Sequence, residues 1–217
     1  MSLANKKPKK VEAFIGWAWL IKNRRKWFLR NISIDVPFVL STTKWGIRME
    51  ETIFKCVFIR EEYFKKNNHL VEILDPGDLQ KQTQRQYIFL GFKYNENTLL
   101  VPLRTEMPDM SKIGQVGYMV PSEEKPNAGL DYRKILIVND DTYIENPPYW
   151  KIPSSQVKII DTNYDTIKNQ VIAYVDGYIK SAKKNRHLRD KKFRYSTLHN
   201  FHSELGIKKG QAVIIGA

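Results

Sequence analysis

The stretch YIFLGFKYNENTLLVPLRTEMP, residues 87–108, decides the fold that we expect for this chain. Apolar and β-favouring residues dominate on both sides of the polar NEN at 95–97, which suits a turn. The pattern predicts a β-hairpin with strands at 87–94 and 98–104. The second strand ends on the RTE at 104–106, where charged and hydroxyl groups replace apolar side chains. That end of the hairpin is therefore the first candidate for a functional site.

Two further strands are expected after the hairpin. The KILIVND at 134–140 predicts a buried strand that a polar turn closes, and residues 157–160 predict another short strand. The residues from 107 to 130 are rich in proline and glycine and predict a long loop, which inside a compact domain is usually functional or mobile.

The end of the chain changes to a helical pattern. Over 161–185 the apolar residues recur at helical spacing, and Asp161 or Thr162 is the expected cap. A second short helix is expected at 196–205, closing on Gly206 in the left-handed conformation. Strands followed by helices indicate an α+β domain with an antiparallel, barrel-like sheet.

The first 48 residues differ in character from the rest. A lysine-rich start is followed by the apolar FIGWAWLI at 14–21, far shorter than the roughly 20 residues that cross a bilayer. We expect a short apolar helix there and irregular structure over 31–48. The chain is predicted to comprise a basic N-terminal extension, 1–48, and a folded domain, 49–217, with Met49 as an alternative start.

The formal net charge is +13, and the excess is concentrated in two blocks. Residues 6–30 carry nine basic side chains against Glu12 alone, and residues 180–194 carry eight against Asp190 alone. Two basic blocks on a nearly neutral body point to a polyanionic partner, with nucleic acid ahead of an anionic membrane. A solvated charged face is the alternative for either block.

Several classes of site are excluded or disfavoured by the sequence. The single cysteine, Cys56, rules out a disulfide framework and a multi-cysteine metal site, and a reducing, cytoplasmic setting is expected. The phosphate-loop patterns GxxxxGKS/T and GxGxxG and the GxSxG elbow are absent. The four histidines show no zinc-binding spacing, so we expect neither a metal nor another cofactor.

Polar residues at the ends of expected elements form the candidate set for chemistry. They are Tyr87, Arg104, Thr105, Lys112, Asp131, Tyr132, Lys134, Asn200 and His202. Such a mixture suits cleavage of RNA without a metal, which needs proton transfer and stabilisation of a charged phosphorane. Each residue also has a structural alternative, because Arg104 could pair with Glu106, His202 could be a packing histidine and Tyr87 could belong to the core.

Five segments, in this order, add a family resemblance: REEYF with VEIL, RQYIFLGFKY, VPLRTE, GLDYRKILIV and YSTLHNFHSELGI. Through them the chain, from about Val57 to Ile207, resembles the toxins of bacterial type III toxin–antitoxin systems. The branch that it resembles is called TenpN and is related to ToxN, CptN and AbiQ. LHNFHSELGI is the most specific of the segments, and residues 1–48 lie outside the resemblance.

The resemblance implies a compact α+β fold, with a strongly bent antiparallel sheet wrapped by helices. The implied activity is that of a metal-independent, sequence-selective endoribonuclease that leaves a 2′,3′-cyclic phosphate and a 5′-hydroxyl on cellular and phage RNA. The implied inhibitor is a small repeated antitoxin RNA that binds the toxin directly. Relatives form closed toxin–RNA rings, so an RNA-mediated oligomer is also implied.

The same resemblance assigns roles to residues. Thr105 stands where relatives commonly have a serine, and Arg104 is the neighbouring phosphate ligand. The catalytic lysine is Lys112 or Lys134, and His202 is the expected proton donor or acceptor, so Arg104, Thr105 and His202 should converge around one scissile linkage.

The RNA path is expected along the second basic block, with aromatic residues that stack on bases. Expected contacts in that block are Lys183, Lys184, Arg186, Arg189, Lys191, Lys192 and Arg194. Tyr132 or Tyr195 is expected to stack on a base, and Tyr87, Lys112 and Asn200 complete the expected RNA contacts. The alternatives are a non-catalytic RNA-binding module that uses the same groove and a membrane-associated protein anchored by residues 11–30.

Overall fold

The computed structural model describes residues 53–147 and 151–208, which contain a seven-stranded antiparallel sheet and helices. The α+β class, the antiparallel sheet and the helices at the end of the chain are therefore confirmed. The sheet curls but does not close into a barrel. The expected extension at 1–48, with its apolar run and the first basic block, lies outside the described residues.

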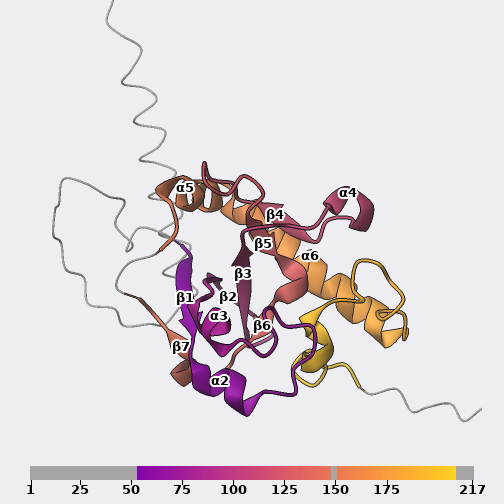
Figure 1. Ribbon diagram of the computed structural model, residues 1–217. Helices are drawn as coiled ribbons and strands as arrows, with labels where there is room; N and C mark the ends of the chain where they lie inside the picture. Colours follow the sequence, from indigo (N-terminus) through magenta and orange to yellow (C-terminus); the bar gives the residue numbers. More distant parts are fainter. Residues whose placement is uncertain (1–52, 148–150, 209–217) are drawn as a thin grey trace, which may run out of the picture. The chain divides into compact units, whose positions relative to one another are not determined.

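The strands follow the spatial order β4-β5-β3-β2-β1-β7, and β6 pairs with β3 beside this path. Their bounds are β1 Lys55–Ile59, β2 Tyr87–Tyr94, β3 Asn97–Arg104, β4 Gly117–Met119, β5 Gly129–Asp131, β6 Leu136–Ile137 and β7 Ile144–Glu145. Figure 1 shows β3 in the middle of the sheet, with β5 and β4 continuing it toward α4, Met110–Ile113. The end of β3 thus lies beside β5, which positions the candidate site.

The hairpin at 87–104 is confirmed almost residue for residue. Tyr94 pairs with Asn97, so the turn consists of Asn95 and Glu96 alone. Both turn residues have positive φ, 46° and 65°, as a two-residue hairpin turn that matches the strand twist requires. Strand β3 therefore begins one residue earlier than the sequence pattern predicts.

A bulge in β2 bends the sheet. Phe89 pairs with Leu100, but the next pair is Lys93 with Thr98, so β2 carries extra residues between the two pairs. Gly91 in this segment has a φ of 68°, a conformation that glycine adopts without strain. The hydroxyl of Tyr164 donates to the carbonyl of Leu90 at 2.6 Å and thereby ties the bulge to the long C-terminal helix.

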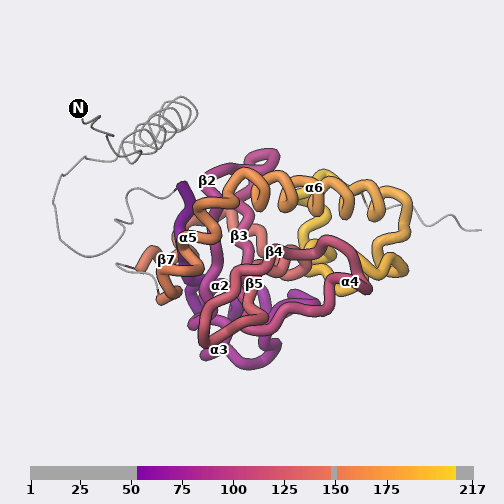
Figure 2. The backbone as a smooth tube through the Cα atoms, turned by 90° about the horizontal axis from the view of Figure 1, so that it is seen from above, coloured from indigo at the N-terminus to yellow at the C-terminus, as the bar shows by residue number. Residues whose placement is uncertain are grey.

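That helix, α6, spans Tyr164–Lys183, as the periodicity predicts. Figure 2 shows it as the long orange helix; it contacts β2 and β4, and its buried face packs into the core. Two expectations for the residues before α6, a strand at 157–160 and a cap at Asp161 or Thr162, are wrong. Residues 157–160 lie within a helix, α5 (Ser154–Thr162). Asp161 and Thr162 therefore end α5 and do not cap α6.

Two other segments are more irregular than predicted. Within 134–140 only Leu136–Ile137 pairs as a strand, because Tyr132–Lys134 forms a 3₁₀ turn before it. The expected helix at 196–205 is a 3₁₀ helix, η4, over Thr197–Phe201, followed by turns. Gly206 has a φ of 63°, so its expected left-handed conformation is confirmed.

The remaining described helices are short. Helix α2 spans Glu61–Lys66 and helix α3 spans Leu79–Gln84. No helix within 53–147 or 151–208 combines the length and the apolar character that crossing a membrane requires.

The bond between Tyr164 and the bulge provides a stability test. Tyr164→Phe removes a buried hydroxyl that satisfies the Leu90 carbonyl, so we expect the free energy of unfolding to fall by about 1–2 kcal/mol. The control is Tyr143→Phe, whose hydroxyl accepts from exposed Lys66, and a change below about 0.5 kcal/mol is expected. Urea unfolding followed by circular dichroism measures both, and equal effects would contradict a special role for the bulge.

Candidate functional site

A groove opens where the start of β2 runs antiparallel to the end of β3. The amide of Leu103 donates to the carbonyl of Gln86 at 3.0 Å, which joins the two strand ends at the floor of the groove. The groove has a volume of about 320 Å³, and Arg104 and Thr105 both line it. The end of the hairpin that the sequence pattern singles out is therefore concave.

The lining of the groove is strongly cationic. Its basic residues are Lys81, Arg85, Arg104, Lys125 and Lys151. No aspartate or glutamate from the described ranges lines it. Lys125 and Lys151 form no ion pair with any described residue, and the ammonium of Lys151 lies 5.7 Å from the centre of the Phe58 ring. The groove is therefore suited to a negatively charged ligand.

Two hydrogen-bond donors in the groove wall have no partner. Arg85 pairs with Asp75 and donates to the carbonyl of Leu103, but its Nε is buried and unpaired within the described structure. The Nε2 atom of Gln86, a residue only 9% exposed, is likewise buried and unpaired. A buried donor without an acceptor costs roughly 1–3 kcal/mol. Because both atoms are buried, an anion in the groove would reach them only after the Arg85 or Gln86 side chain turned outward.

Arg104 is held by a buried carboxylate and not by Glu106. Its Nη1 donates to Asp131 Oδ2 at 2.8 Å, and Asp131 has no exposed surface. The same carboxylate accepts from Arg133 at 3.0 and 3.1 Å and from the Arg133 amide at 3.1 Å. Two guanidinium groups around one carboxylate leave a net positive charge, so Asp131 orients Arg104 without neutralising the groove.

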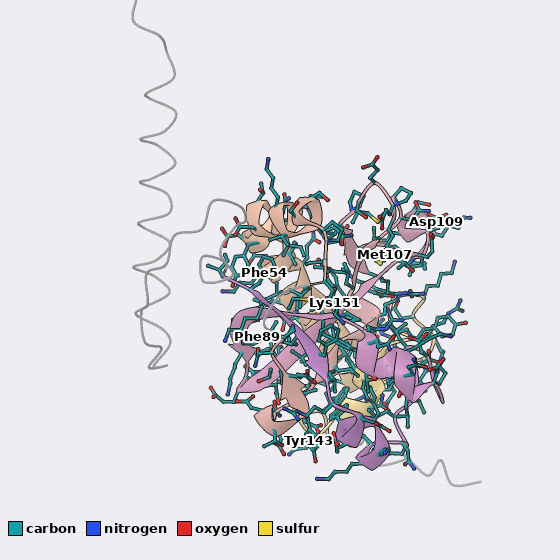
Figure 3. The ribbon with its side chains drawn as sticks, turned by 60° about the vertical axis from the view of Figure 1, so that its left-hand side comes forward. Phe54, Phe89, Met107, Asp109, Tyr143 and Lys151 are labelled. Atoms are coloured by element: carbon teal, nitrogen blue, oxygen red, sulfur yellow. The ribbon has the colours of Figure 1, made fainter. Side chains whose placement is uncertain are left out.

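The segment that carries Thr105 is fixed by close packing. The Met107 amide donates to the Asn127 carbonyl at 2.9 Å, and the Met107 side chain covers Gly117 and Gly129. A Cβ at Gly129 would lie 2.7 Å from Met107 Cγ, so no larger residue fits there without displacing it. Met107 and Lys151 are labelled in Figure 3. Thr105 itself is exposed at the mouth of the groove.

Neither expected lysine reaches the groove. Lys112 lies on α4 with 82% of its side chain exposed, 3.2 Å from Asp109. Lys134 is largely buried and donates to the carbonyl and carboxylate of Glu72 and to the carbonyl of Tyr195. Burial lowers the pKa of Lys134, while Glu72 opposes that shift. Lys134 therefore anchors a loop, and the lysines at the groove are residues that the sequence analysis missed.

His202 also lies outside the groove, which corrects the expected convergence with Arg104 and Thr105. Its Nε2 lies 2.7 Å from the hydroxyl of Tyr178, and the same hydroxyl lies 2.8 Å from Nδ1 of His199. His187 completes this group, with its ring 5.3 Å from that of His202. We call His187, His199 and His202 the trihistidine cluster.

Three of the expected RNA contacts are structural. Tyr87 and Tyr132 are 3% and 0% exposed, so neither offers a ring face on which a base could stack. Burial raises the pKa of both hydroxyls. The side chain of Asn200 clamps the backbone of Val71, accepting from its amide at 2.9 Å and donating to its carbonyl at 2.8 Å. These residues carry the fold.

The second basic block spans the last turn of α6 and the exposed loop that follows it. Lys183, Lys184, Arg186, Arg189, Lys191 and Arg194 are exposed, and Lys192 is half-buried. The Lys192 ammonium lies over the rings of Tyr174 and Phe193, and the Arg194 guanidinium lies 4.6 Å from the centre of the Tyr195 ring. Tyr195 is 46% exposed. The loop thus presents cations and one accessible aromatic ring together, which suits a nucleic-acid surface.

The groove residues that sequence reasoning missed could have been found from strand register. Tyr87 pairs with Pro102, so Arg85 and Gln86 must stand opposite the end of β3. Strand register does not identify Lys125 and Lys151, because they lie in loops whose path depends on tertiary packing.

Comparisons with known proteins concern the fold. No protein-family model matches the chain, and no curated protein matches it. Among solved structures, AbiQ, a lactococcal anti-phage endoribonuclease of the type-III toxin–antitoxin system, is 16% identical with a TM-score of 0.49, and the match covers 72% of this chain and 99% of that chain.

Two further solved structures are similar at the same level. One comes from work on selective toxin inhibition by a non-coding RNA pseudoknot in bacterial type III systems; it is 16% identical with a TM-score of 0.47, covering 71% of this chain and 99% of that chain. The other concerns a processed non-coding RNA that regulates a bacterial antiviral system. It is 13% identical with a TM-score of 0.45, and the match covers 61% of this chain and 88% of that chain. Likeness of this size does not establish shared activity, so the groove must be interpreted from its own residues.

The buried carboxylate provides a test of how the site is built. Asp131→Asn leaves two guanidinium groups without their counter-charge, so we expect the free energy of unfolding to fall by about 3 kcal/mol. Asp109→Asn is the control, because its carboxylate is 53% exposed and its pair with Lys112 contributes less than about 1 kcal/mol. Chemical denaturation compares the two, and a loss for Asp131→Asn no larger than for the control would refute the anchoring role.

Proposed function

We propose that this chain is an endoribonuclease toxin of a type III toxin–antitoxin system, of the TenpN branch, acting on cellular and phage RNA in the cytoplasm. Its activity is metal-independent and sequence-selective, and a repeated antitoxin RNA inhibits it by binding directly. The observation that carries the proposal is the groove at Arg104 and Thr105, which is lined by five cationic side chains and by no described carboxylate. The segments VPLRTE and GLDYRKILIV, on which the family resemblance rests, contribute Arg104 with Thr105 and the Asp131 that orients Arg104.

The geometry suits attack of a ribose 2′-hydroxyl on the adjacent phosphate. A bond forms between the 2′-oxygen and phosphorus while a base takes the proton of the 2′-hydroxyl and passes it to solvent. The bond to the 5′-oxygen breaks, and that oxygen receives a proton from an acid. Arg104 and Arg85 can stabilise the phosphorane's charge, because both are held at the groove by buried or half-buried carboxylates. Lys125 and Lys151 are the groove lysines without an ion-pair partner among described residues, and we assign the proton donor to one of them.

Thr105 would orient the phosphate through its hydroxyl. We expect Thr105→Ala to lower the rate of RNA cleavage roughly 100-fold, as loss of one donor to a transition-state oxygen does. Thr105→Ser keeps the hydroxyl and should retain most of the activity. Incubation with total RNA in EDTA, followed by analysis of fragment ends, should yield 2′,3′-cyclic phosphates and 5′-hydroxyls, with circular dichroism in the same buffer confirming that the protein stays folded.

The alternative is a non-catalytic RNA-binding module that uses the same cationic groove. Under that alternative the folded protein binds RNA tightly and leaves it intact, with or without divalent metal. Intact RNA together with a folded protein would therefore refute the nuclease assignment, whereas fragments with 5′-phosphates would refute only the proposed chemistry.

The basic loop provides an independent prediction about RNA binding. The RNA association constant falls as salt concentration rises, and each phosphate contact on a single strand contributes about −0.7 to the slope of its logarithm against log salt concentration. If Lys183 and Lys184 each contact a phosphate, replacing both by alanine should therefore make that slope less negative by about 1.4. The matched control is Lys65→Ala, an exposed lysine on α2 that pairs with Glu61. A slope unchanged by the double substitution would identify the loop as a solvated face.

A further inference from the structure

We propose that the trihistidine cluster is a structural Zn²⁺ site that fastens the basic loop to η4. His187 lies in the loop that follows α6, whereas His199 and His202 come from η4 and the residue that ends it. A metal held by the three would cross-link residue 187 to residues 199 and 202 and so close the segment that carries Arg189, Lys191, Lys192 and Arg194. The proposal does not rest on RNA cleavage, since none of the three histidines lines the groove.

The spacing of the imidazoles fits a metal. One nitrogen from each histidine lies within 4.8 Å of the other two. Zinc binds histidine nitrogens at about 2.0–2.1 Å, which places the ligand atoms of a tetrahedral site roughly 3.3 Å apart. The present separations, up to 4.8 Å, would therefore have to shorten for a metal to bind all three nitrogens.

Hydrogen bonding prepares His199 to act as a ligand. Its Nε2 lies 3.2 Å from the carbonyl of Arg194, and a carbonyl can only accept, so Nε2 carries the proton. Nδ1 then presents its lone pair toward the hydroxyl of Tyr178, 2.8 Å away, within the cluster. A ligating histidine whose second nitrogen donates to a backbone carbonyl is the usual arrangement in metal sites.

His187 supplies the observation that points to a missing ligand. Its Nδ1 is buried and has no hydrogen-bond partner among the described residues. A metal ion at the centre of the cluster would satisfy it.

Tyr178 closes the remaining side of the cluster. Its hydroxyl lies 2.7–2.8 Å from one nitrogen each of His199 and His202, and the residue has no exposed surface. Tyr178 covers this side only, because His199 and His202 are half-buried, so a water molecule would take the fourth position of a tetrahedral site. Three neutral imidazoles favour Zn²⁺ over Mg²⁺ or Ca²⁺, which prefer oxygen ligands.

The experiment uses tag-free, full-length protein that has been stripped with chelator and dialysed. Titration with Co²⁺ should produce the visible absorption bands of a tetrahedral site, saturating at one equivalent, and Zn²⁺ should abolish them. His187→Asn should lower the affinity at least 100-fold. The matched control is His69→Ala, which removes the exposed fourth histidine and should leave binding unchanged.

A second measurement covers variants that fold poorly. Zn²⁺ should raise the midpoint of thermal unfolding of the wild type and of His69→Ala, and should slow tryptic cleavage within 183–196. Two outcomes would overturn the proposal: no saturable binding by the folded wild type, or binding by folded His187→Asn equal to that of the wild type. In either case the cluster would be a hydrogen-bonded packing group and not a metal site.

Discussion

The carboxylate of Asp131 is the group on which the candidate site depends. It is fully buried, which is costly for a charge, and it is stable only because two guanidinium groups and a backbone amide surround it. Asp131 ends β5, and Arg104 ends β3 in the register that places it opposite Gly129. The ion pair therefore ties the strand pairing to the position of the one arginine that both lines the groove and adjoins Thr105.

The groove and the bulge lie toward opposite ends of the β2–β3 pair. The bulge after Phe89 changes the register between β2 and β3, and Tyr164 fixes it from α6. Near the hairpin turn the sheet packs under the C-terminal helix, whereas at the other end Arg85 stands opposite Arg104 with no carboxylate between them. Cations brought this close repel one another, and Asp75 and Asp131 offset that repulsion from behind the groove wall.

The sequence predicts elements that depend on residues close together in the chain. It does not predict side-chain positions that depend on contacts between residues far apart in the chain. The hairpin and α6 follow from residue periodicity, since turn and apolar spacing are properties of neighbouring residues. Residues 157–160 were predicted as a strand because a short apolar run does not distinguish strand from helix. His202 was assigned to the groove by its motif, but its packing against Tyr178, which is remote in sequence, places it elsewhere.

Residues 71–75 connect the groove wall to the region around η4. The Val71 backbone is clamped by Asn200, Glu72 accepts from Lys134, and Asp75 pairs with Arg85 in the groove wall. Glu72 and Asp75 both have positive φ, at 61° and 52°, which costs energy for residues other than glycine and persists only where surrounding contacts hold it. Each of these contacts involves a charged side chain or both the amide and the carbonyl of Val71, so polar bonds hold the segment at both ends, while Ile73 between them packs against the core. The cationic wall of the groove and the region around η4 are therefore not independent surfaces, because one strained segment is anchored to both.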